Sequence, residues 1–453
     1  MDEVKLPEGW EYSQLLKLGT IVTGKTPNTK DVDNFGGNIP FIKPGDLDKG
    51  GFITETSDTL TESGLLTVPK LPVNAIVVTC IGNLGKVGIT TKTSATNQQI
   101  NSFICNENLN FKFLYYQICT LKPWLENESS ATTIAIVNKG KFSKAPISIP
   151  SLAEQKIIAD KLDTLLAQVD STKAHLEKIP QILKHFRLAV LTAAVSGKLT
   201  EEWRDINSSE KWETVKLLDI IVAKPRNGYS PKGVEYETAI KNLTLSAVTK
   251  GYFIENCFKY VDIDISDDSY LWVKNGDILI QRANSLEYVG VSAIYEGKDN
   301  QYIYPDLMMK FRVNERILTK YLHYSLLSEP TREYFRKNAS GTTGNMPKIN
   351  QGTVSAAPVN LPPISEQTEI VRRVEQLFAY ADSIEKLVQD ALERVNNLTQ
   401  SILAKAFRGE LTAQWRAENP DLISGENSAR TLLEKIQQQR TSTKTIKRSK
   451  GNS

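Results

Sequence analysis

The sequence predicts an α+β protein in which two mixed α/β modules alternate with two long helices. The helices are expected to pair as an antiparallel coiled coil, and the chain is expected to be an internal repeat with pseudo-two-fold symmetry. Three observations predict this: a helical segment that occurs twice without a gap, a heptad pattern inside both copies, and a β-rich region before each copy.

The repeated segment begins and ends in the same way in both copies. The first copy opens with Pro-Ser-Leu-Ala-Glu-Gln at 150–155 and closes with Gly-Lys-Leu-Thr-Glu-Glu-Trp-Arg at 197–204. The second opens with Pro-Pro-Ile-Ser-Glu-Gln at 362–367 and closes with Gly-Glu-Leu-Thr-Ala-Gln-Trp-Arg at 409–416. At both ends, corresponding residues of the two copies are 212 positions apart, so the copies match without insertion or deletion. A repeat of this length indicates duplicated structure.

Apolar residues within each copy alternate at spacings of four and three, which is typical of a narrow coiled-coil seam. A single heptad helix most often serves generic dimerisation or scaffolding, but two matching seams in one chain favour internal pairing. Each helix should span roughly 65 Å at about 1.5 Å per residue. The predicted seam comprises Ile158, Leu162, Leu165, Val169, Leu176 and Leu183 in the first copy, and Ile370, Val374, Leu377, Ile384, Val388, Val395 and Leu398 in the second.

The ends and interruptions of these helices are also predicted by local chemistry. Ser151 and Glu154 have the spacing of a capping box at the start of the first helix. Gly197 and Gly409 are suited to end the two helices. Pro180 should kink or split the first helix, whereas the second, without a proline there, should run straighter.

The two β-rich regions share an outline but few polar residues. Predicted strands at 76–79 and 276–280 are each followed by a turn and another strand, at 86–90 and 288–294. Helical stretches follow at 113–125 and 318–336, and then polar loops with paired threonines. Drift after duplication would explain this difference, but two similar modules that recognise different targets at a fixed separation explain it as well.

Composition narrows the class of protein. The chain has 453 residues, a net charge of +3 and four cysteines without CxxC spacing, so neither a disulfide framework nor a zinc site is predicted. The polar start and the lack of a long apolar run favour a cytoplasmic protein. The basic end from Arg440 to Lys450 is expected to be a disordered tail.

No arrangement of residues predicts catalysis or a metal site. The three histidines stand apart in the sequence, and the aspartates at 262–268 are better explained as a solvated turn than as metal ligands. A glycine-containing turn at 82–87 lacks the spacing of a phosphate-binding loop. The sequence therefore favours a protein that recognises a target over an enzyme.

The module, the opening Glu-Gln, the heptad helix and the closing Leu-Thr-x-x-Trp-Arg, all given twice, resemble the specificity subunit of a type I restriction–modification enzyme. The segment 409–428 is similar to the K-type (type IA) branch in particular. The resemblance implies target-recognition domains at 1–149 and 207–361, helical spacers at 150–206 and 362–416, and a C-terminal extension at 417–453.

The resemblance also implies function and partners. Each recognition domain would read one half of a bipartite, asymmetric site in double-stranded DNA, and the coiled coil would set the spacer. Two modification subunits would supply S-adenosylmethionine and adenine methylation, and two restriction subunits would add ATP- and Mg²⁺-dependent translocation and cleavage. This chain itself would bind none of these cofactors.

Polar loops of both modules are the expected DNA-contacting regions, because Arg, Asn and Gln read base edges whereas Lys, Ser and Thr suit phosphates. The candidates are Lys25, Thr26, Lys43, Asn97, Gln98, Gln99, Thr132 and Thr133 in the first module, and Arg226, Asn227, Tyr229, Arg282, Asn284, Thr342, Thr343 and Lys348 in the second.

Two other classes of function remain open from the residues alone. A fused methyltransferase–specificity chain is disfavoured because no segment outside the modules and helices is long enough for a catalytic domain. A coiled-coil scaffold without a DNA role is the other alternative.

Overall fold

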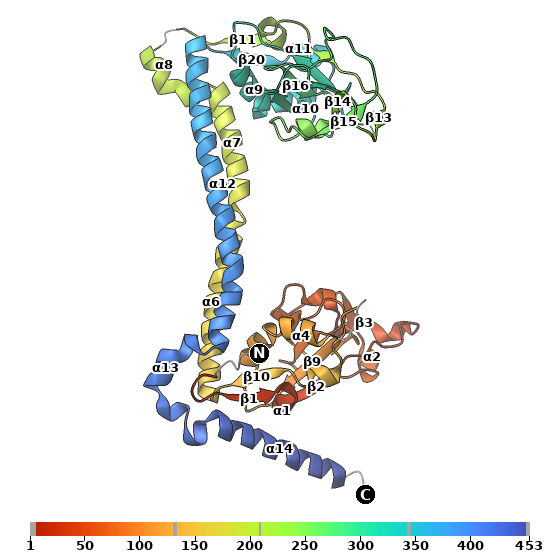
Figure 1. Ribbon diagram of the computed structural model, residues 1–453, viewed down its shortest axis with the longest axis vertical. Helices are drawn as coiled ribbons and strands as arrows, with labels where there is room; N and C mark the ends of the chain where they lie inside the picture. The colour runs from red at the N-terminus through yellow and green to blue at the C-terminus, as the bar shows by residue number, and fades with distance from the viewer. Residues whose placement is uncertain (1–5, 130–133, 208–209, 342–345, 450–453) are drawn as a thin grey trace. The chain divides into compact units, whose positions relative to one another are not determined.

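The computed structural model describes residues 6–129, 134–207, 210–341 and 346–449, with side chains up to residue 442. The chain divides into two compact units (Figure 1). The first unit comprises Met1–Leu176 and Ala391–Ser453, and the second comprises Glu177–Asp390. Within the described ranges, no helix combines the length and the apolar character needed to cross a membrane.

The first module is built from three small sheets and several short helices. One sheet pairs β1 (Glu11–Gln14) with β10 (Pro146–Ile149). The largest sheet has the strand order β2 (Gly19–Thr23), β9 (Ile100–Cys105), β6 (Ile76–Thr79), β7 (Val87–Thr90) and β4 (Phe52–Ile53). The third sheet has the order β5 (Asp58–Leu60), β3 (Phe35–Ile42) and β8 (Ala95–Thr96). Its helices are α1 (Leu15–Leu18), α2 (Glu62–Leu66), α3 (Phe111–Cys119), α4 (Lys122–Glu128) and α5 (Lys139–Phe142).

The second module is assembled in the same way. One sheet pairs β11 (Glu213–Lys216) with β20 (Pro358–Leu361). A second sheet has the strand order β12 (Arg226–Asn227), β19 (Met308–Phe311), β16 (Ile278–Gln281) and β17 (Ser292–Ile294). The third has the order β13 (Gly233–Val234), β15 (Phe258–Val261), β14 (Ile240–Leu243) and β18 (Tyr302–Ile303). Its helices are α9 (Thr319–Leu327), α10 (Glu329–Lys337) and α11 (Gln351–Ser355).

The two modules share one strand order although their sequences share little. The antiparallel neighbours β2, β9, β6 and β7 of the first correspond to β12, β19, β16 and β17 of the second. In the smaller sheets, the parallel pair β3 and β8 corresponds to β14 and β18. The likeness therefore extends beyond the landmarks found in the sequence, because the pattern of buried residues sets strand pairing and tolerates changes of polar side chains.

The predicted strands at 76–79 and 276–280 are β6 and β16, but each predicted helical stretch is two helices. Helix α4 follows α3 with Pro123 in its first turn, and α10 follows α9 with Pro330 in its first turn. Proline has no N–H to donate, so it interrupts a running helix but suits the first turn of a new one.

The first long helix is broken where proline predicts it. Helix α6 (Leu152–Leu176) ends before α7 (Ile179–Val195), and Pro180 lies in the first turn of α7. The second copy forms one uninterrupted helix of 44 residues, α12 (Ile364–Phe407). Gly197 and Gly409 follow the helix ends with φ of 80° and 74°, a conformation that glycine adopts without strain.

The helices run antiparallel within each unit. In the second unit, Arg187 of α7 is ion-paired with Asp382 and Glu385 of α12. Beyond the C-terminal end of α7, Leu199 O accepts a hydrogen bond from Arg373, which lies nearer the start of α12. In the first unit, Lys161 near the start of α6 donates to Leu411 O just beyond the end of α12. The predicted α+β class with paired long helices is therefore confirmed.

Burial follows the predicted seam along most of both helices. Ile158, Leu162, Ile370 and Val374 are fully buried. Leu398 departs from the pattern, because it is 44% exposed. Its prediction as a seam residue is wrong: the buried row continues instead through Leu403 and Ala406, which join the core of the first module. The strict heptad spacing ends there because the helix turns its apolar face towards a globular core.

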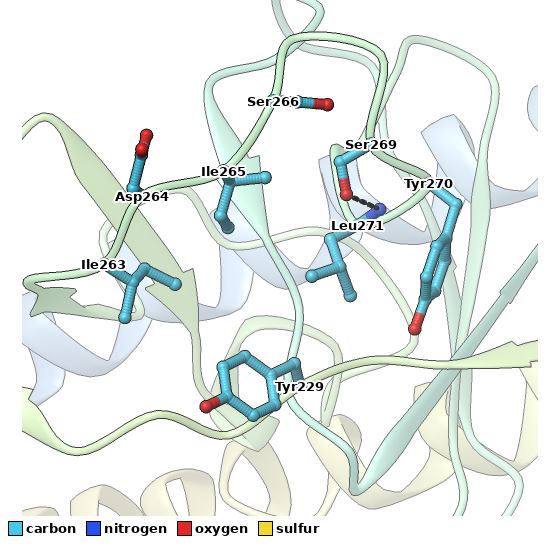
Figure 2. Close-up of a pocket in the computed structure, with 8 residues that line it drawn as sticks. All are labelled: Tyr229, Ile263, Asp264, Ile265, Ser266, Ser269, Tyr270 and Leu271. Carbon is cyan, nitrogen blue, oxygen red and sulfur yellow. Dashed lines mark hydrogen bonds between the residues drawn. The ribbon is translucent and has the colours of Figure 1, made fainter.

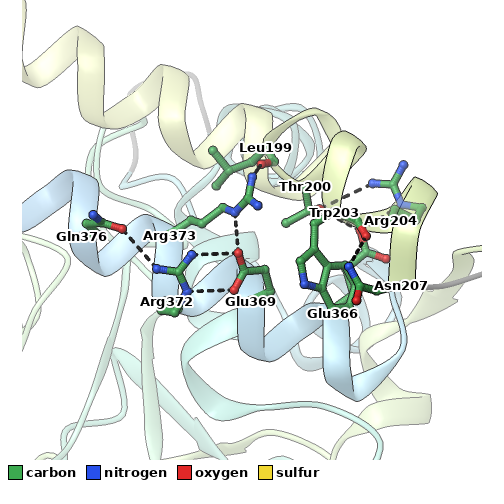
Figure 3. A network of polar contacts seen from close by, with 10 residues as sticks. All are labelled: Leu199, Thr200, Trp203, Arg204, Asn207, Glu366, Glu369, Arg372, Arg373 and Gln376. Carbon is green, nitrogen blue, oxygen red and sulfur yellow. Dashed lines mark hydrogen bonds and ion pairs between the residues drawn. The ribbon is translucent and has the colours of Figure 1, made fainter.

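A buried glutamate joins three segments of the second unit. Thr200 and Arg204, after the end of α7, donate to Glu366 Oε1 at 2.7 and 2.9 Å (Figure 3). Trp212, at the start of the second module, donates from Nε1 to Glu366 Oε2 at 2.8 Å. Arg204 also donates to Gly197 O at 2.5 Å. The carboxylate thereby fixes the start of the module, the start of α12 and the end of α7 together.

The first unit repeats this network residue by residue. Thr412 and Arg416 donate to Glu154 Oε1, both at 2.6 Å, and Trp10 donates to Oε2 at 3.1 Å. Arg416 also donates to Gly409 O at 2.7 Å. The capping-box prediction is therefore half wrong: Ser151 Oγ accepts from the Glu154 N–H at 3.3 Å, but the Glu154 carboxylate serves the network. A fully buried carboxylate is held best by charged and polar donors.

The glutamine of each opening motif attaches the module to the same helix. Gln155 accepts from the N–H of Asn110, the cap residue of α3, at 3.0 Å. Gln367 accepts from the N–H of Leu318, the cap residue of α9, at 2.7 Å. The repeated Glu-Gln pair thus has two structural roles.

The C-terminal extension differs from its prediction. After the short helix α13 (Ala413–Glu418), helix α14 (Ala429–Ser449) occupies the segment expected to be a disordered tail. Its residues Ala429, Leu432 and Ile436 join the core of the first module. Arg440 donates to Gly19 O at 2.8 Å. An apolar stripe at helical spacing, hidden among polar residues, explains the difference.

Candidate nucleic-acid interface

Those predicted contact residues of the first module that the structure describes lie together at the ends of three strands. Lys25, after β2, donates its N–H to Thr96 O at 2.9 Å. Thr26 donates to Gln98 Oε1 at 2.6 Å. Lys43, after β3, follows Ile42, whose carbonyl accepts from Asn97 N–H at 3.2 Å. The structure therefore brings residues distant in the sequence to one edge of the module.

These residues differ in how freely a ligand reaches them. Lys25 and Gln98 are exposed, whereas Lys43 forms an ion pair with Asp58. Asn97 is only 7% exposed, and its side chain bonds Gln99 through both the Gln99 N–H, at 3.1 Å, and the Gln99 side chain, at 3.0 Å. Its expected direct contact with DNA therefore does not fit its position; it holds the turn that presents Gln98 and Gln99.

The predicted residues of the second module also meet at one end of a sheet. Arg226 and Asn227 form β12, which pairs with β19, and Arg282 comes directly after β16, which pairs with the other side of β19. Asn284 donates its N–H to Pro347 O at 3.2 Å, and Lys348 forms a bridge to Ala283. Arg226, Tyr229 and Lys348 are exposed, while Asn227, Arg282 and Asn284 are partly covered.

Beneath this cluster, the strand partner of Arg226 is engaged in a buried ion pair, whereas Arg226 itself is exposed. Lys310, the strand partner of Arg226, lies 3.2 Å from Asp277 and donates to Trp272 O at 2.5 Å. Burial lowers the pKa of Lys310. Arg226 instead places its guanidinium 4.6 Å from the ring centroid of Tyr270, a favourable cation–π geometry.

The two clusters occupy equivalent places in the shared topology. Lys25 and Thr26 follow β2, as Tyr229 follows β12, and Gln98 and Gln99 precede β9, as Asp306 precedes β19. The same positions therefore carry different chemistry in the two modules. The four threonines Thr132, Thr133, Thr342 and Thr343 lie outside the described residues.

A hollow beside the second cluster was not predicted from the sequence. It has a volume of about 590 Å³ and is lined by Tyr229, Ile263, Asp264, Ile265, Ser266, Ser269, Tyr270 and Leu271 (Figure 2). Tyr270 is the one signal that the sequence offered, since it is a large aromatic residue within an Asp- and Ser-rich turn. Such an aromatic usually packs inwards, yet here it is 46% exposed.

Comparison with known proteins gives a consistent result. The family model described as the type I restriction modification DNA specificity domain matches residues 7–181 and 209–394. The chain is 40% identical to the EcoKI specificity subunit of Escherichia coli K12, with 97% of each chain covered. It is 38% identical to the StySPI specificity subunit of Salmonella potsdam, again with 97% of each covered.

Solved structures show the same fold at low sequence identity. A chain from a study of complex assembly and conformational transition of the type I R-M system aligns with a TM-score of 0.65 and 16% identity, over 90% of this chain and 99% of that one. The HsdS subunit of Thermoanaerobacter tengcongensis aligns with a TM-score of 0.57 and 16% identity, with the same coverage.

Proposed function

Because the chain belongs to the family of type I restriction–modification specificity subunits, we propose that it selects the DNA site at which partner subunits act. Each module reads one half of a bipartite, asymmetric site in double-stranded DNA. The paired helices fix the number of unread base pairs between the halves. The chain carries no catalytic role of its own.

The observation that carries this proposal is the contrast between shared topology and unshared contact residues. The exposed positions after β2 and before β9 hold Lys25 and Gln98, while the matching positions of the second module hold Tyr229 and Asp306. Base-edge recognition depends on the donors and acceptors that a side chain presents, so two such surfaces read different sequences. Identical modules would instead read a symmetric site.

The helices suit the role of a spacer. Helix α12 has 44 residues, and at about 1.5 Å per residue it is roughly 65 Å long. Two half-sites about one DNA turn apart are separated by about 34 Å. A helix of this length, paired along its seam, is long enough to keep two recognition surfaces apart.

The repeat also supports the proposed partners. The Glu154 and Glu366 networks give each unit the same helix ends, so one kind of partner has two equivalent places to dock. We therefore assign two modification subunits, which use S-adenosylmethionine to methylate adenine, and two restriction subunits, which use ATP and Mg²⁺. The complex acts in the cytoplasm.

Mapping adenine methylation tests the proposal. The chain would be expressed with its modification subunit in a host without other adenine methyltransferases, and modified positions would be read by single-molecule sequencing. We expect one asymmetric site with two specified halves and a fixed gap. Methylation without sequence preference, or none with partners present, would support a scaffold role instead; methylation by the purified chain alone would support the fused-enzyme alternative.

Exchange of one module separates its contribution. Replacing residues 1–149 by a recognition domain of another specificity should change one half of the methylated site and leave the other half and the gap unchanged. The reciprocal exchange of residues 207–361 serves as the matched control. A change in both halves after one exchange would contradict the division into two readers.

A further inference from the structure

The hollow in the second module combines an apolar floor with two aromatic walls. Ile263, Ile265 and Leu271 direct their side chains towards the space between Tyr229 and Tyr270 (Figure 2). Tyr229 is 52% exposed and Tyr270 is 46% exposed, so both rings present much of their surface to a ligand. A volume of about 590 Å³ lies in the range of sites that hold small organic groups.

Both tyrosines are held in place by contacts that leave their rings accessible. The backbone of Tyr229 donates to Tyr304 O at 2.9 Å and accepts from Asn242 Nδ2 at 2.9 Å. Tyr270 carries the Arg226 guanidinium 4.6 Å from its centroid. The loop between them is fixed because buried Trp272 donates from Nε1 to Ser266 O at 3.0 Å. The hollow is therefore preformed, and a ligand entering it meets little ordering cost.

The first module has no equivalent of this feature among its described residues. Lys25 stands where the second module has Tyr229, and the connection that follows β5 contains helix α2, where the loop 262–272 follows β15. A partner common to both modules would need a common surface. A feature of one module alone points to the DNA half-site that this module reads.

The shape and charge of the hollow define what part of DNA fits it. Reading a base edge inside a groove requires a protruding side chain, whereas a hollow accepts a group that protrudes from the DNA. Asp264 lines the hollow, and Asp262, Asp267 and Asp268 belong to the same acidic loop, so this part of the surface repels phosphate.

We propose that this hollow binds a nucleobase displaced from the duplex within the half-site of the second module, stacked against Tyr229 and Tyr270. Apolar contact with Ile263, Ile265 and Leu271 replaces the lost stacking on neighbouring bases. The inference rests on the proposed function, since it concerns the DNA that the module recognises.

Mismatch scanning with the wild-type complex tests the displacement. Duplex oligonucleotides bearing the mapped site would carry a mismatch at each position of the second half-site in turn, and affinity would be measured by fluorescence anisotropy. A mismatch removes the cost of unpairing, so one position other than the methylated adenine, which the modification subunit itself displaces, should bind about tenfold more tightly than the matched duplex. If every mismatch weakens binding or leaves it unchanged, the proposal is overturned.

Variants then assign the displaced base to this hollow. Tyr229→Ala and Tyr270→Ala should each weaken binding of the cognate duplex by about tenfold, because each removes a stacking surface. They should also remove preference at the mismatch-sensitive position and keep discrimination in the first half-site. Tyr229→Phe and Tyr270→Phe, which keep the ring, should bind like wild type. Equal binding by the alanine variants would overturn the assignment.

The two proposals fail in different ways. If the wild-type complex does not discriminate its mapped site from unrelated DNA, the proposed function fails. If it discriminates normally but shows no mismatch-enhanced position, only the displaced base fails. Thermal unfolding of each variant identifies loss of folding, and the mismatch scan does not depend on any variant.

Discussion

The two units use the same internal contacts to support different surfaces. In each, a buried glutamate binds a tryptophan from the module and a threonine and an arginine from beyond the opposite helix. At the strand ends, by contrast, the first unit presents Lys25 and Gln98 where the second presents Tyr229 and Asp306. The difference shows that the contacts that attach a module and the side chains that it presents at its strand ends vary independently.

A second difference lies at the chain end. Helix α14 covers part of the first module, where Arg440 donates to Gly19 O, and the second unit has no counterpart among its described residues. The first unit therefore has a larger core than the repeat requires. Comparing the two units shows which contacts support both modules and which support only one.

The largest effect should come from charge placed in the shared seam. Ile158→Asp and Ile370→Asp occupy equivalent positions, both fully buried, and each should destabilise its own unit by about 5 kcal/mol through a lost apolar side chain and a buried charge. Hydrogen exchange resolved by peptide measures each unit separately. Leu398→Asp is the control and should change stability by about 0.5 kcal/mol or less. Comparable damage from Leu398→Asp would restore that residue to the seam.

Breaking the glutamate network should come next and should differ between units. Arg416→Met leaves Glu154, whose side chain is 1% exposed, without its cation and should cost about 3 to 5 kcal/mol. Arg204→Met should cost less, because Arg204 is 26% exposed against 13% for Arg416, and water replaces it more readily. Chemical denaturation, monitored in each unit by hydrogen exchange, measures the loss of stability caused by each substitution. The double variant Glu154→Gln/Arg416→Met should recover much of the loss; no recovery would contradict the buried-charge explanation.

Removing α14 should separate the units further. Truncation after Ser428 removes the contribution of Ala429, Leu432 and Ile436 to the first core and should cost that unit about 2 kcal/mol, after the entropy regained by the freed chain is subtracted. Amide hydrogen exchange at residues 15–19 should become faster, while exchange in the second unit should remain unchanged. Equal destabilisation of both units would show that α14 has a role beyond its own module.

The smallest effect should be a pH dependence confined to the second unit. Burial lowers the pKa of His323 below the ordinary value of 6.5, and its Nε2 lies 3.0 Å from Ser292 O. Because the unfolded chain binds this proton more readily, stability is complete above pH 6.5 and falls as the pH drops below it, by at most about 1.4 kcal/mol per pH unit. Unfolding at several pH values measures the slope. His323→Gln should flatten it, and an unchanged slope would assign it to other groups.

The sequence was sufficient to predict those features of the fold that residues close together in the chain determine. The duplicated helices, the break at Pro180 and the glycine ends at Gly197 and Gly409 follow from residues near one another in the chain. The partners of Glu154 do not, because Thr412 and Arg416 lie more than 250 positions away and meet it only in the folded unit. Its spacing from Ser151 suggested a local cap, but the carboxylate makes the long-range contact.

The candidate interface was predicted in part for the same reason. Polar residues in loops were identified by type, and the structure gathers them at the strand ends. Residue type does not show which are accessible, so Asn97 was expected at a surface although it is buried. Tyr270 was missed because an aromatic residue in a turn usually packs inwards, and its exposure depends on the surrounding loop. The C-terminal helix was missed because its apolar residues are few.

The composition of the units bears on the order in which they form during synthesis. The second unit is drawn from one continuous stretch, Glu177–Asp390, so all partners of Glu366 are present soon after that residue leaves the ribosome. The first unit waits for Arg416, although its module is made first. At about 5 to 20 residues per second, the interval between Glu154 and Arg416 lasts roughly 13 to 52 seconds. The part of the protein that is synthesised first is therefore the last to complete its buried contacts.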